Sequence, residues 1–264
     1  MNTETHQEPY VLRSDSQGVT TLTLNRPNQF NSLSGAMIGA LQAELDAIAA
    51  DPTVRVVVLA GAGKAFCAGH DLKEMRANHN KAFMQALFKQ CGKMMMTITQ
   101  MPQPVIARIH GIATAAGCQL VSMCDLAVAA DVARFATSGI NVGLFCATPG
   151  VGLSRNLGRK QALEMLLTGD FIDAATALQQ GLVNRVVPVD ALDAEVDKLA
   201  QSIIAKSSVA IGMGKQMFYK QLEMGLDAAY QYASEVMACN MMSEDAAEGI
   251  DAFIGKRKAE WKGR

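Results

Sequence analysis

The stretch that decides the fold is PVIARIHGIATAAGCQLVSMCDLAVAAD, residues 104–131. It opens with an apolar run, Val105–Ile109, which is typical of a short strand buried on both faces of a sheet. The spacing over Thr114–Cys124 then predicts a short helix with its N-cap at the threonine. A second apolar run, Leu126–Ala130, predicts another strand. This alternation of strand and helix indicates an α/β protein with a largely parallel sheet.

The same alternation continues toward the amino terminus. The pattern predicts a half-buried strand at Thr21–Leu24, a helix at Ser34–Ala50 and a buried strand at Val54–Leu59. A further helix is expected from Leu72, with Asp71 as its N-cap and Glu74 as the capping partner, and it continues, broken or bent, toward Gln100.

Toward the carboxyl terminus the strands stop. Residues 135–152 are rich in Gly, Thr, Ser and Asn, so we expect loop and turns over a site. Helices follow at Gln161–Leu167 and Ala174–Gln180, then a last strand at Leu182–Val187. From Asp190 onward every segment has helical spacing. We therefore expect an α/β core at residues 1–188 and a C-terminal helical region at residues 189–264.

Composition argues against several classes of partner. Lys plus Arg number 24 and Asp plus Glu 25, which gives a net charge of -1 and no basic field for nucleic acid. The longest apolar stretches, such as Val54–Ala62, fall short of the roughly 20 residues that cross a bilayer. The amino end, MNTETHQEPY, has the features of neither a secretory signal nor a transit peptide, so we expect a cytoplasmic location without nucleic-acid or membrane partners. The cysteines form no CxxC pair, so neither a metal site nor a disulfide framework is expected.

Three segments carry a resemblance to a known family. LNRPNQFNSLS at 24–34, KAFCAGHDLKEM at 64–75 and the stretch at 104–131 resemble the signature regions of the crotonase superfamily, the enoyl-CoA hydratase/isomerase family. Residues 158–188 and FIGKRKAEW at 253–261 also fit. Within the family, NVGLFCATPGVGLSR at 141–155 resembles most closely the subgroup called enoyl-CoA hydratase domain-containing protein 3.

The resemblance implies a spiral of ββα units that forms two roughly perpendicular sheets. It also implies C-terminal helices that assemble a homotrimer, often a dimer of trimers. The implied ligand is an acyl-CoA thioester, with no separate cofactor. By motif position, its carbonyl would lie between the backbone N–H groups of His70 and Ala116, which would hold the enolate that forms in the reaction.

Local chemistry supports both positions. With Thr114 as N-cap, the Ala116 N–H is a free donor at the positive end of a helix dipole, provided that the threonine hydroxyl caps Gly117 instead. His70 lies before the N-cap Asp71 in a turn that Gly69 makes permissive. The imidazole of His70 either faces the cavity as an acid or is structural, and a single histidine is more often structural.

The resemblance fails at two glutamates with which hydratases of the family hold and activate water. Their positions carry Gln119 and Gly139 here. Gln119 can orient a water or hydroxyl, but a neutral amide cannot take its proton. The aspartate of dehalogenase relatives falls near Ala147, and the neighbouring Cys146 reads as a small buried hydrophobe. No replacement base is evident.

Other residues are candidates for binding the substrate. These are Arg26, Lys64, Ala68, Asp71, Leu72, Asn141, Phe253 and Lys256, and analogy with relatives places the segment 64–68 beside the adenine and pantetheine of the coenzyme. Asn141 equally suits a turn. Phe253 and Lys256 resemble a pair that reaches the nucleotide from a neighbouring subunit, although IGKRK also reads as a solvated basic helix end.

Three functions stay open. The first is an enzyme of the enoyl-CoA hydratase/isomerase type. The second is an acyl-CoA-binding protein without lyase activity. The third is a related enolate reaction, decarboxylation or thioester hydrolysis.

Overall fold

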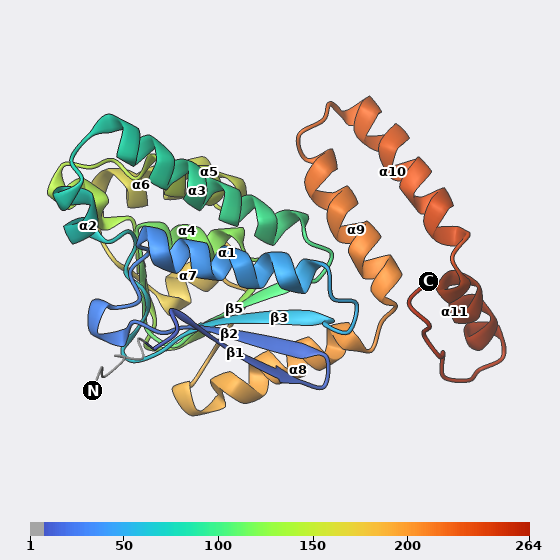
Figure 1. Cartoon of the computed structure of the whole chain (residues 1–264). Helices are drawn as coiled ribbons and strands as arrows, with labels where there is room; N and C mark the ends of the chain where they lie inside the picture. The colour runs from blue at the N-terminus through green and yellow to red at the C-terminus, as the bar shows by residue number, and fades with distance from the viewer. Residues whose placement is uncertain (1–7) are drawn as a thin grey trace, which may run out of the picture.

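The computed structural model describes residues 8–264 (Figure 1). Within that range one sheet has six strands, in the order β1 (Val11–Ser16), β2 (Val19–Leu24), β3 (Val56–Gly61), β5 (Val105–Ile109), β7 (Leu126–Ala130) and β10 (Arg185–Val187). A second sheet has four, in the order β4 (Ala65–Cys67), β6 (Ile112–Thr114), β8 (Arg134–Ala136) and β9 (Ile172–Asp173). Residues 1–7 lie outside this range, so the expectation that the amino end is neither a secretory signal nor a transit peptide stays a prediction.

The helices fall between and after these strands. They are α1 (Gly35–Ala49), α2 (Leu72–Ala77), α3 (Lys81–Gln100), α4 (Ala116–Met123), α5 (Ala147–Asn156), α6 (Arg159–Thr168), α7 (Ala174–Gln180), α8 (Leu192–Ile204), α9 (Ser208–Gln221), α10 (Leu226–Met241) and α11 (Glu244–Ile254). Short 3₁₀ turns cover Pro27–Gln29 (η1), Ser138–Val142 (η2) and Val189–Ala191 (η3).

From β3 to β8, successive strands alternate between the two sheets. β3, β5 and β7 run parallel in the large sheet, while β4, β6 and β8, each the next strand along the chain, run parallel in the small one. β1 and β9 are antiparallel additions at the edges. The predicted mixed α/β fold, built from ββα units, is therefore confirmed.

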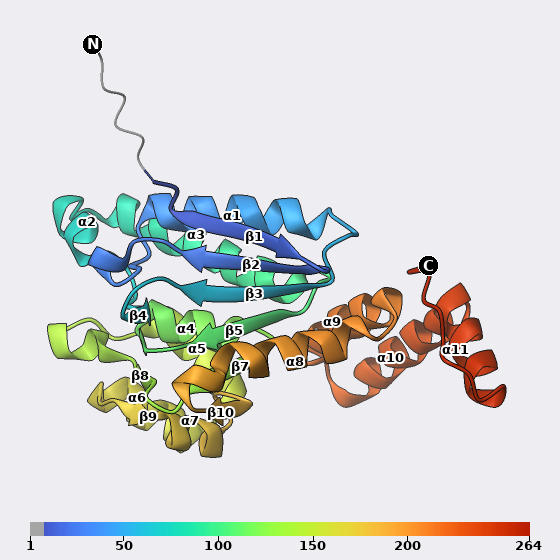
Figure 2. The ribbon, with the colours of Figure 1, turned by 90° about the horizontal axis from the view of Figure 1, so that it is seen from below.

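The large sheet is covered on both faces. Its strands carry apolar side chains on either side: Val57 and Leu59 belong to the core that includes α1, whereas Val56 and Val58 pack with Leu192 of α8. Figures 1 and 2 show α1 and α3 on one face and α8 crossing the other. Continuous β-branched runs are the pattern of strands buried on both faces, as predicted.

Helix α1 begins where the sequence predicts. Ser34 is its N-cap, with Oγ 3.2 Å from the Met37 amide nitrogen that donates to it. Asp71 caps α2 in the same way, accepting from Lys73 and Glu74. The expected role of Glu74 as its capping partner is wrong, because the Glu74 carboxylate instead accepts from the Gly35 N–H at 2.9 Å.

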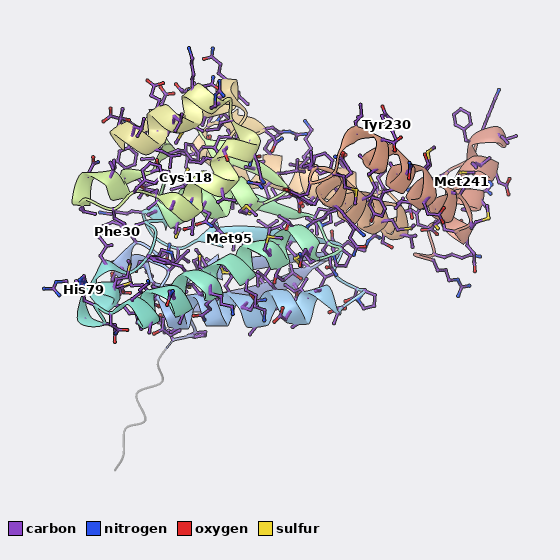
Figure 3. All side chains as sticks on the ribbon, turned by 90° about the horizontal axis from the view of Figure 1, so that it is seen from above. Phe30, His79, Met95, Cys118, Tyr230 and Met241 are labelled. Carbon is purple, nitrogen blue, oxygen red and sulfur yellow. The ribbon has the colours of Figure 1, made fainter. Side chains whose placement is uncertain are left out.

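Beyond β10 the described chain contains only helices, and three of them project from the sheet (Figure 1). α9 is anchored to the core through Lys215, which lies 2.6 Å from the Asp125 carboxylate. Figure 3 shows Tyr230 and Met241 on this projection, far from Met95 and Cys118 in the core. The division into domains at residue 188 stays a prediction.

The segment 135–152 differs from the prediction. It contains η2 and the first half of α5 rather than loop throughout. Helix α5 packs against α4, and tertiary packing of this kind overrides weak local propensity. Pro149 is tolerated because it lies in the first turn, where its missing N–H would have no helical partner.

None of the helices formed by residues 8–264 combines the length and apolar character that spanning a membrane requires.

Candidate functional site

Two remote segments meet at the site. One is the turn between β4 and α2, and the other is the start of α4. Gly69 in the turn has a φ of +93°, and a Cβ there would lie 2.8 Å from the Ala115 Cβ and 3.2 Å from the Ala116 nitrogen. A Cβ at Gly117 would lie 2.0 Å from the Cys67 carbonyl oxygen. Only glycine allows this close approach, which brings His70 beside the first turn of α4.

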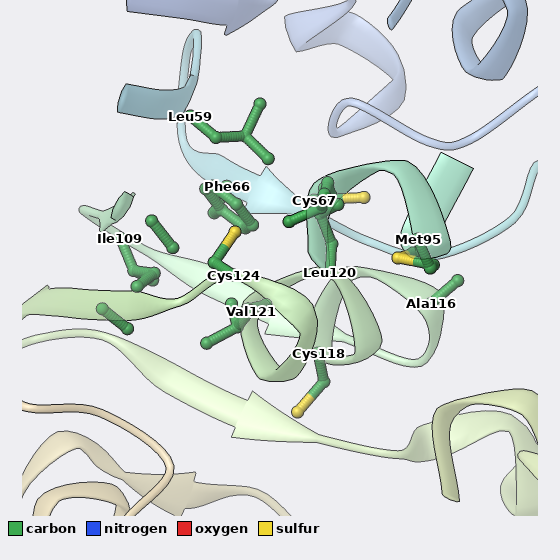
Figure 4. Packing of buried hydrophobic residues seen from close by; sticks show 14 of the residues in the cluster. Leu59, Phe66, Cys67, Met95, Ile109, Ala116, Cys118, Leu120, Val121 and Cys124 are labelled. Carbon is green, nitrogen blue, oxygen red and sulfur yellow. The ribbon is translucent and has the colours of Figure 1, made fainter. Parts of the chain in front are cut away.

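Figure 4 shows how α4 is held. Its Leu120 and Val121 lie among Phe66, Cys67 and other buried residues, and Ala116 lies at the end of the helix near Met95. The start of α4 is therefore fixed by the core.

The Ala116 N–H is free for a reason that differs from the prediction. Thr114 is not the N-cap, because it is the last residue of β6 and its hydroxyl lies 2.7 Å from the Ser138 hydroxyl. Ala115 is the N-cap, with a φ of 51° and no capping side chain. Its own N–H donates to Ala136 O at 3.0 Å, which extends the strand pairing by one residue. No acceptor within residues 8–264 takes the Ala116 N–H.

The His70 N–H is free because of a strand-like pairing. The Leu33 N–H donates to Gly69 O at 2.7 Å, and the Asp71 N–H donates to Leu33 O at 3.4 Å. In a parallel bridge these bonds come from the residues on either side of His70, so its own N–H points away from Leu33. No described residue accepts it.

Both residues line one cavity of about 240 Å³. Its walls are mostly apolar: α2 and α3 contribute Leu72, Met75 and Phe88, and the end of η2 with the loop before α5 contributes Val142, Leu144 and Phe145. The described lining contains no Asp, Glu, Lys or Arg, and its titratable groups are His70 and Cys146. The arrangement offers two main-chain donors within an apolar enclosure.

The imidazole of His70 is held firmly. Nδ1 lies 3.2 Å from Leu33 O, and the ring packs edge-to-face on Phe88 at a centroid distance of 5.3 Å. Burial lowers the pKa of His70 below its usual value. Its Nε2 is buried and has no hydrogen-bond partner in the described chain.

The two positions at which family hydratases carry glutamate, Gln119 and Gly139 here, differ in their relation to the cavity. Gln119 is buried and lies outside the cavity lining, and within the described residues its Oε1 has no partner. Gly139 does line the cavity. A Cβ on it would lie 2.6 Å from Leu144 O and 2.8 Å from Cys146 Sγ, so no side chain fits there without moving the loop. Burial raises the pKa of Cys146, which keeps its thiol protonated.

The structure brings some of the substrate-binding candidates to the cavity. Ala68 and Leu72 line it. Asp71 instead caps α2, and Lys64 is exposed between β3 and β4. Asn141 lies in η2, where its amide donates to Gly169 O at 3.5 Å, so its contacts are those of a turn residue.

The guanidinium of Arg26 is already engaged. It lies 3.7 Å from the centre of the Tyr10 ring and donates to backbone oxygens of Glu8, Pro9 and Asn25. Its observed contacts therefore hold the start of the described chain against the η1 turn.

The C-terminal pair lies elsewhere. Phe253 is on α11 and 86% exposed, and Lys256 follows that helix. Figure 1 shows α11 at the opposite end of the molecule from α2 and α4. Within one chain the structure does not bring either residue to the cavity.

The apolar wall was not predicted. Met75 and Phe88 have the spacing of ordinary helix residues that face a core, and Val142, Leu144 and Phe145 lie in a segment that reads as a loop. Nothing in their local pattern distinguishes a cavity wall from packing. Only the meeting of α2, α3 and the loop before α5 makes them one surface.

Comparisons with known proteins agree with the resemblance in the sequence. The model of the enoyl-CoA hydratase/isomerase family matches residues 14–264. Enoyl-CoA hydratase domain-containing protein 3, mitochondrial, of Xenopus laevis is 44% identical over 263 residues, covering 99% of this chain and 90% of the relative.

Solved structures agree as well. The crystal structure of an enoyl-CoA hydratase of Mycobacterium smegmatis has a TM-score of 0.95 and 58% identity, covering 96% of this chain and 99% of the other. That of human enoyl-CoA hydratase domain-containing protein 3 has a TM-score of 0.93 and 43% identity, covering 96% and 100%. The predicted fold and the predicted subgroup resemblance are confirmed.

Proposed function

Because the chain belongs to the enoyl-CoA hydratase/isomerase family, we propose that it is an acyl-CoA enzyme in which the N–H groups of His70 and Ala116 bind the thioester oxygen. The observation that carries this is the pair of main-chain donors on one apolar cavity, neither with an acceptor among the described residues. The thioester carbonyl is the ligand group that such a pair fits.

The physical reason is the charge that develops on that oxygen. When a nucleophile adds to an enoyl thioester, or a base removes the α-proton, electrons move onto the thioester oxygen. Fixed donors in a site that excludes water stabilise the developing charge, and removing one such donor costs about 2.7–4 kcal/mol in known enzymes. Backbone groups of a glycine turn and a helix start are already in place before the ligand arrives.

The rest of the substrate follows from the walls. Leu72, Met75 and Phe88 suit an apolar acyl chain, because apolar surface favours apolar ligand groups. Gln119 lies outside the cavity lining, so it would orient a water or hydroxyl only if the ligand or the helix start shifts toward it. Asn141, Lys64 and the C-terminal pair stay proposals as substrate contacts.

The absence of Asp and Glu from the described cavity lining favours a second candidate, an acyl-CoA-binding protein without turnover. General acid-base catalysis by a placed group contributes roughly 10²- to 10⁴-fold, so losing both carboxylates should slow hydration severely. A decarboxylation or a thioester hydrolysis would depend less on those two groups.

One set of measurements tests these alternatives. Hydration of crotonyl-CoA is followed by its absorbance, a panel of saturated and carboxylated acyl-CoAs is assayed for hydrolysis and decarboxylation, and binding is measured by calorimetry. Turnover of any thioester supports the enzyme. Saturable binding without turnover supports the second candidate, and no binding at all would contradict both.

We also propose an assembly of three copies or of two trimers. It is supported by the apolar side chains that α9–α11 expose, among them Leu226, Met237 and Phe253. In such an assembly the Phe253 and Lys256 of one copy would reach the nucleotide bound to another. A cytoplasmic location stays a prediction, and the relative from Xenopus laevis carries the word mitochondrial in its name.

A further inference from the structure

The imidazole of His70 belongs to a residue of the cavity wall. The residue lies between Gly69 and the α2 N-cap, its backbone N–H is one of the two free donors, and it lines the cavity. The ring is therefore carried by the same residue whose N–H would hold the thioester oxygen. Asp, Glu and Lys are absent from the described lining, so no other strong proton acceptor is available.

The hydrogen bond to Leu33 fixes which ring nitrogen carries the proton. A carbonyl oxygen only accepts, so the contact of 3.2 Å requires a proton on Nδ1. In the neutral ring Nε2 then has a free lone pair. Burial lowers the pKa of His70, which favours this neutral form at neutral pH.

Nε2 is also an acceptor without a donor. It is buried, and no described residue hydrogen-bonds to it. Buried polar atoms in native proteins are almost always paired, and the exceptions often mark functional sites. Because side chains cover Nε2 in the ligand-free structure, a substrate reaches it only by displacing one of them; the Phe88 ring is in contact and on the cavity wall.

The neighbouring titratable groups do not compete for this role. Cys146 on the wall is kept as a thiol, and burial raises the pKa of Cys67 and of Cys91 to about 12. Glu74 on α2 raises the pKa of His70 by its charge, but its carboxylate accepts from Gly35 and lies outside the described lining.

From this geometry we propose that His70 Nε2 is the proton acceptor of the site. It would act in place of the two glutamates whose positions carry Gln119 and Gly139 in this chain. The proposal rests on the proposed function, with an enoyl thioester as substrate and water as co-reactant. The water proton passes to Nε2 while the water oxygen bonds to the β-carbon. The electrons of the double bond move onto the thioester oxygen, and the proton on the imidazolium then passes to the α-carbon, which restores the neutral ring.

The main test is His70→Asn. Its amide can still donate to Leu33 O and its backbone N–H is retained, but it has no basic nitrogen. We expect kcat for crotonyl-CoA to fall roughly 10²- to 10⁴-fold with little change in KM or in melting temperature. The matched control is His79→Asn, because His79 is exposed and outside the cavity lining, and its activity should equal that of the wild type.

The pH profile gives a second readout. A neutral imidazole base is active above its pKa, so wild-type kcat should be level at high pH and fall as the pH drops through the His70 pKa, below the ordinary value of about 6.5. In His70→Asn the fall of kcat at low pH should be absent. If His70 were purely structural, the substitution would leave the pH at which kcat falls unchanged.

Nitrogen NMR of the histidine side chains tests the proposal without turnover. In the free protein, Nε2 of His70 should carry no proton, and 3-hydroxybutyryl-CoA should shift its signal as the hydroxyl donates to it. Wild-type kcat in His70→Asn, or a proton on Nε2 in the free protein, would overturn the role of His70 and leave the acyl-CoA function intact. Absence of acyl-CoA binding would overturn both.

Discussion

Two glycines shape the cavity, and each does so for its own reason. Gly69 has a φ of +93°, a conformation that side chains disfavour, and it lies against the start of α4. Gly139 has no such backbone demand, but the space where its Cβ would lie is filled by Leu144 O and Cys146 Sγ. Gly69 therefore positions the His70 N–H, and Gly139 lets the loop at Leu144 and Cys146 pack tightly on the cavity wall.

Gly69→Ala should therefore impair the site more than the fold. The new Cβ would lie 3.2 Å from the Ala116 nitrogen and displace the turn that carries the His70 N–H. If a donor is lost, kcat/KM should drop roughly 10²- to 10³-fold. The measurement is steady-state kinetics beside thermal melting.

Gly181→Ala is the control for backbone strain. The φ of Gly181, +87°, is similar to that of Gly69. A Cβ added to Gly181 would have its nearest contact at an ordinary 3.6 Å from Asn156 O, and the residue lies outside the cavity lining. It should lose stability but keep kcat/KM. Equal kinetic effects of the two substitutions would contradict the positioning role of Gly69.

Gly139→Ala should destabilise the protein by about 1–3 kcal/mol, because overpacking forces the backbone of the loop to move. The free energy of unfolding in urea measures it. Gly92→Ala is the opposite case: nothing lies within 4 Å of its Cβ position in the middle of α3, so we expect stabilisation of about 0.4–1 kcal/mol. Stabilisation by Gly139→Ala would show that the loop adapts freely.

At the scale of elements, α9 is held by a buried polar cluster. Lys215 donates to Ile98 O at 2.7 Å, to Gln103 O at 2.8 Å and to the Asp125 carboxylate at 2.6 Å. Tyr219, one turn later on α9, donates to the other oxygen of Asp125 at 2.8 Å. The side chains of Lys215 and Asp125 are 6% and 13% exposed, so water cannot substitute for a missing partner.

Asp125→Asn should thus be strongly destabilising. Removing one partner of a buried ion pair leaves the other charge uncompensated, at a cost of about 3–5 kcal/mol. Chemical denaturation measures the loss. Tyr219→Phe removes one hydrogen bond to the same carboxylate and should cost less, about 1.5–3 kcal/mol. A smaller effect for Asp125→Asn than for Tyr219→Phe would contradict this account of the anchor.

Elements that depend on local pattern could be predicted from the sequence. The strand at Val105–Ile109 and the caps at Ser34 and Asp71 follow from residues close in the chain. β1 and the strands of the small sheet are not predicted, since they are short or carry no strong alternation of their own. The prediction of Thr114 as a cap is wrong because its partner, Ser138, comes from a remote segment.

For the candidate site too, the parts that depend on local pattern could be predicted and the parts that depend on distant contacts could not. A motif can point to His70 and Ala116 because their backbone positions depend on short-range glycine turns and helix starts. The orphaned Nε2 of His70 depends on the contact with Leu33, and the fit at Gly139 depends on a loop that doubles back. Such contacts between distant residues leave no local signal.

At the scale of the whole molecule, the helices α10 and α11 leave large apolar side chains uncovered. Several large apolar side chains of α10 and α11 are more than two-thirds exposed in the single chain: Leu226, Tyr230, Met237, Phe253 and Ile254. Scattered apolar side chains on a surface are common, whereas a contiguous apolar patch is typical of an interaction site. The proposed assembly would bury it.

Met237→Glu should weaken that assembly, because a carboxylate would have to be buried in an apolar interface. Sedimentation velocity should show a shift toward smaller species as the protein is diluted. Val132→Glu, a similarly exposed apolar position between β7 and β8, should leave the distribution unchanged. A wild-type protein that sediments as a monomer would contradict the proposed assembly.

The tight packing around Gly139 also limits how a carboxylate could be engineered into the cavity. A glutamate at this position would require the main chain near Leu144 to move, because Leu144 O lies 2.6 Å from where its Cβ would be. A design that adds the acid should therefore widen the turn at neighbouring positions before it introduces the glutamate.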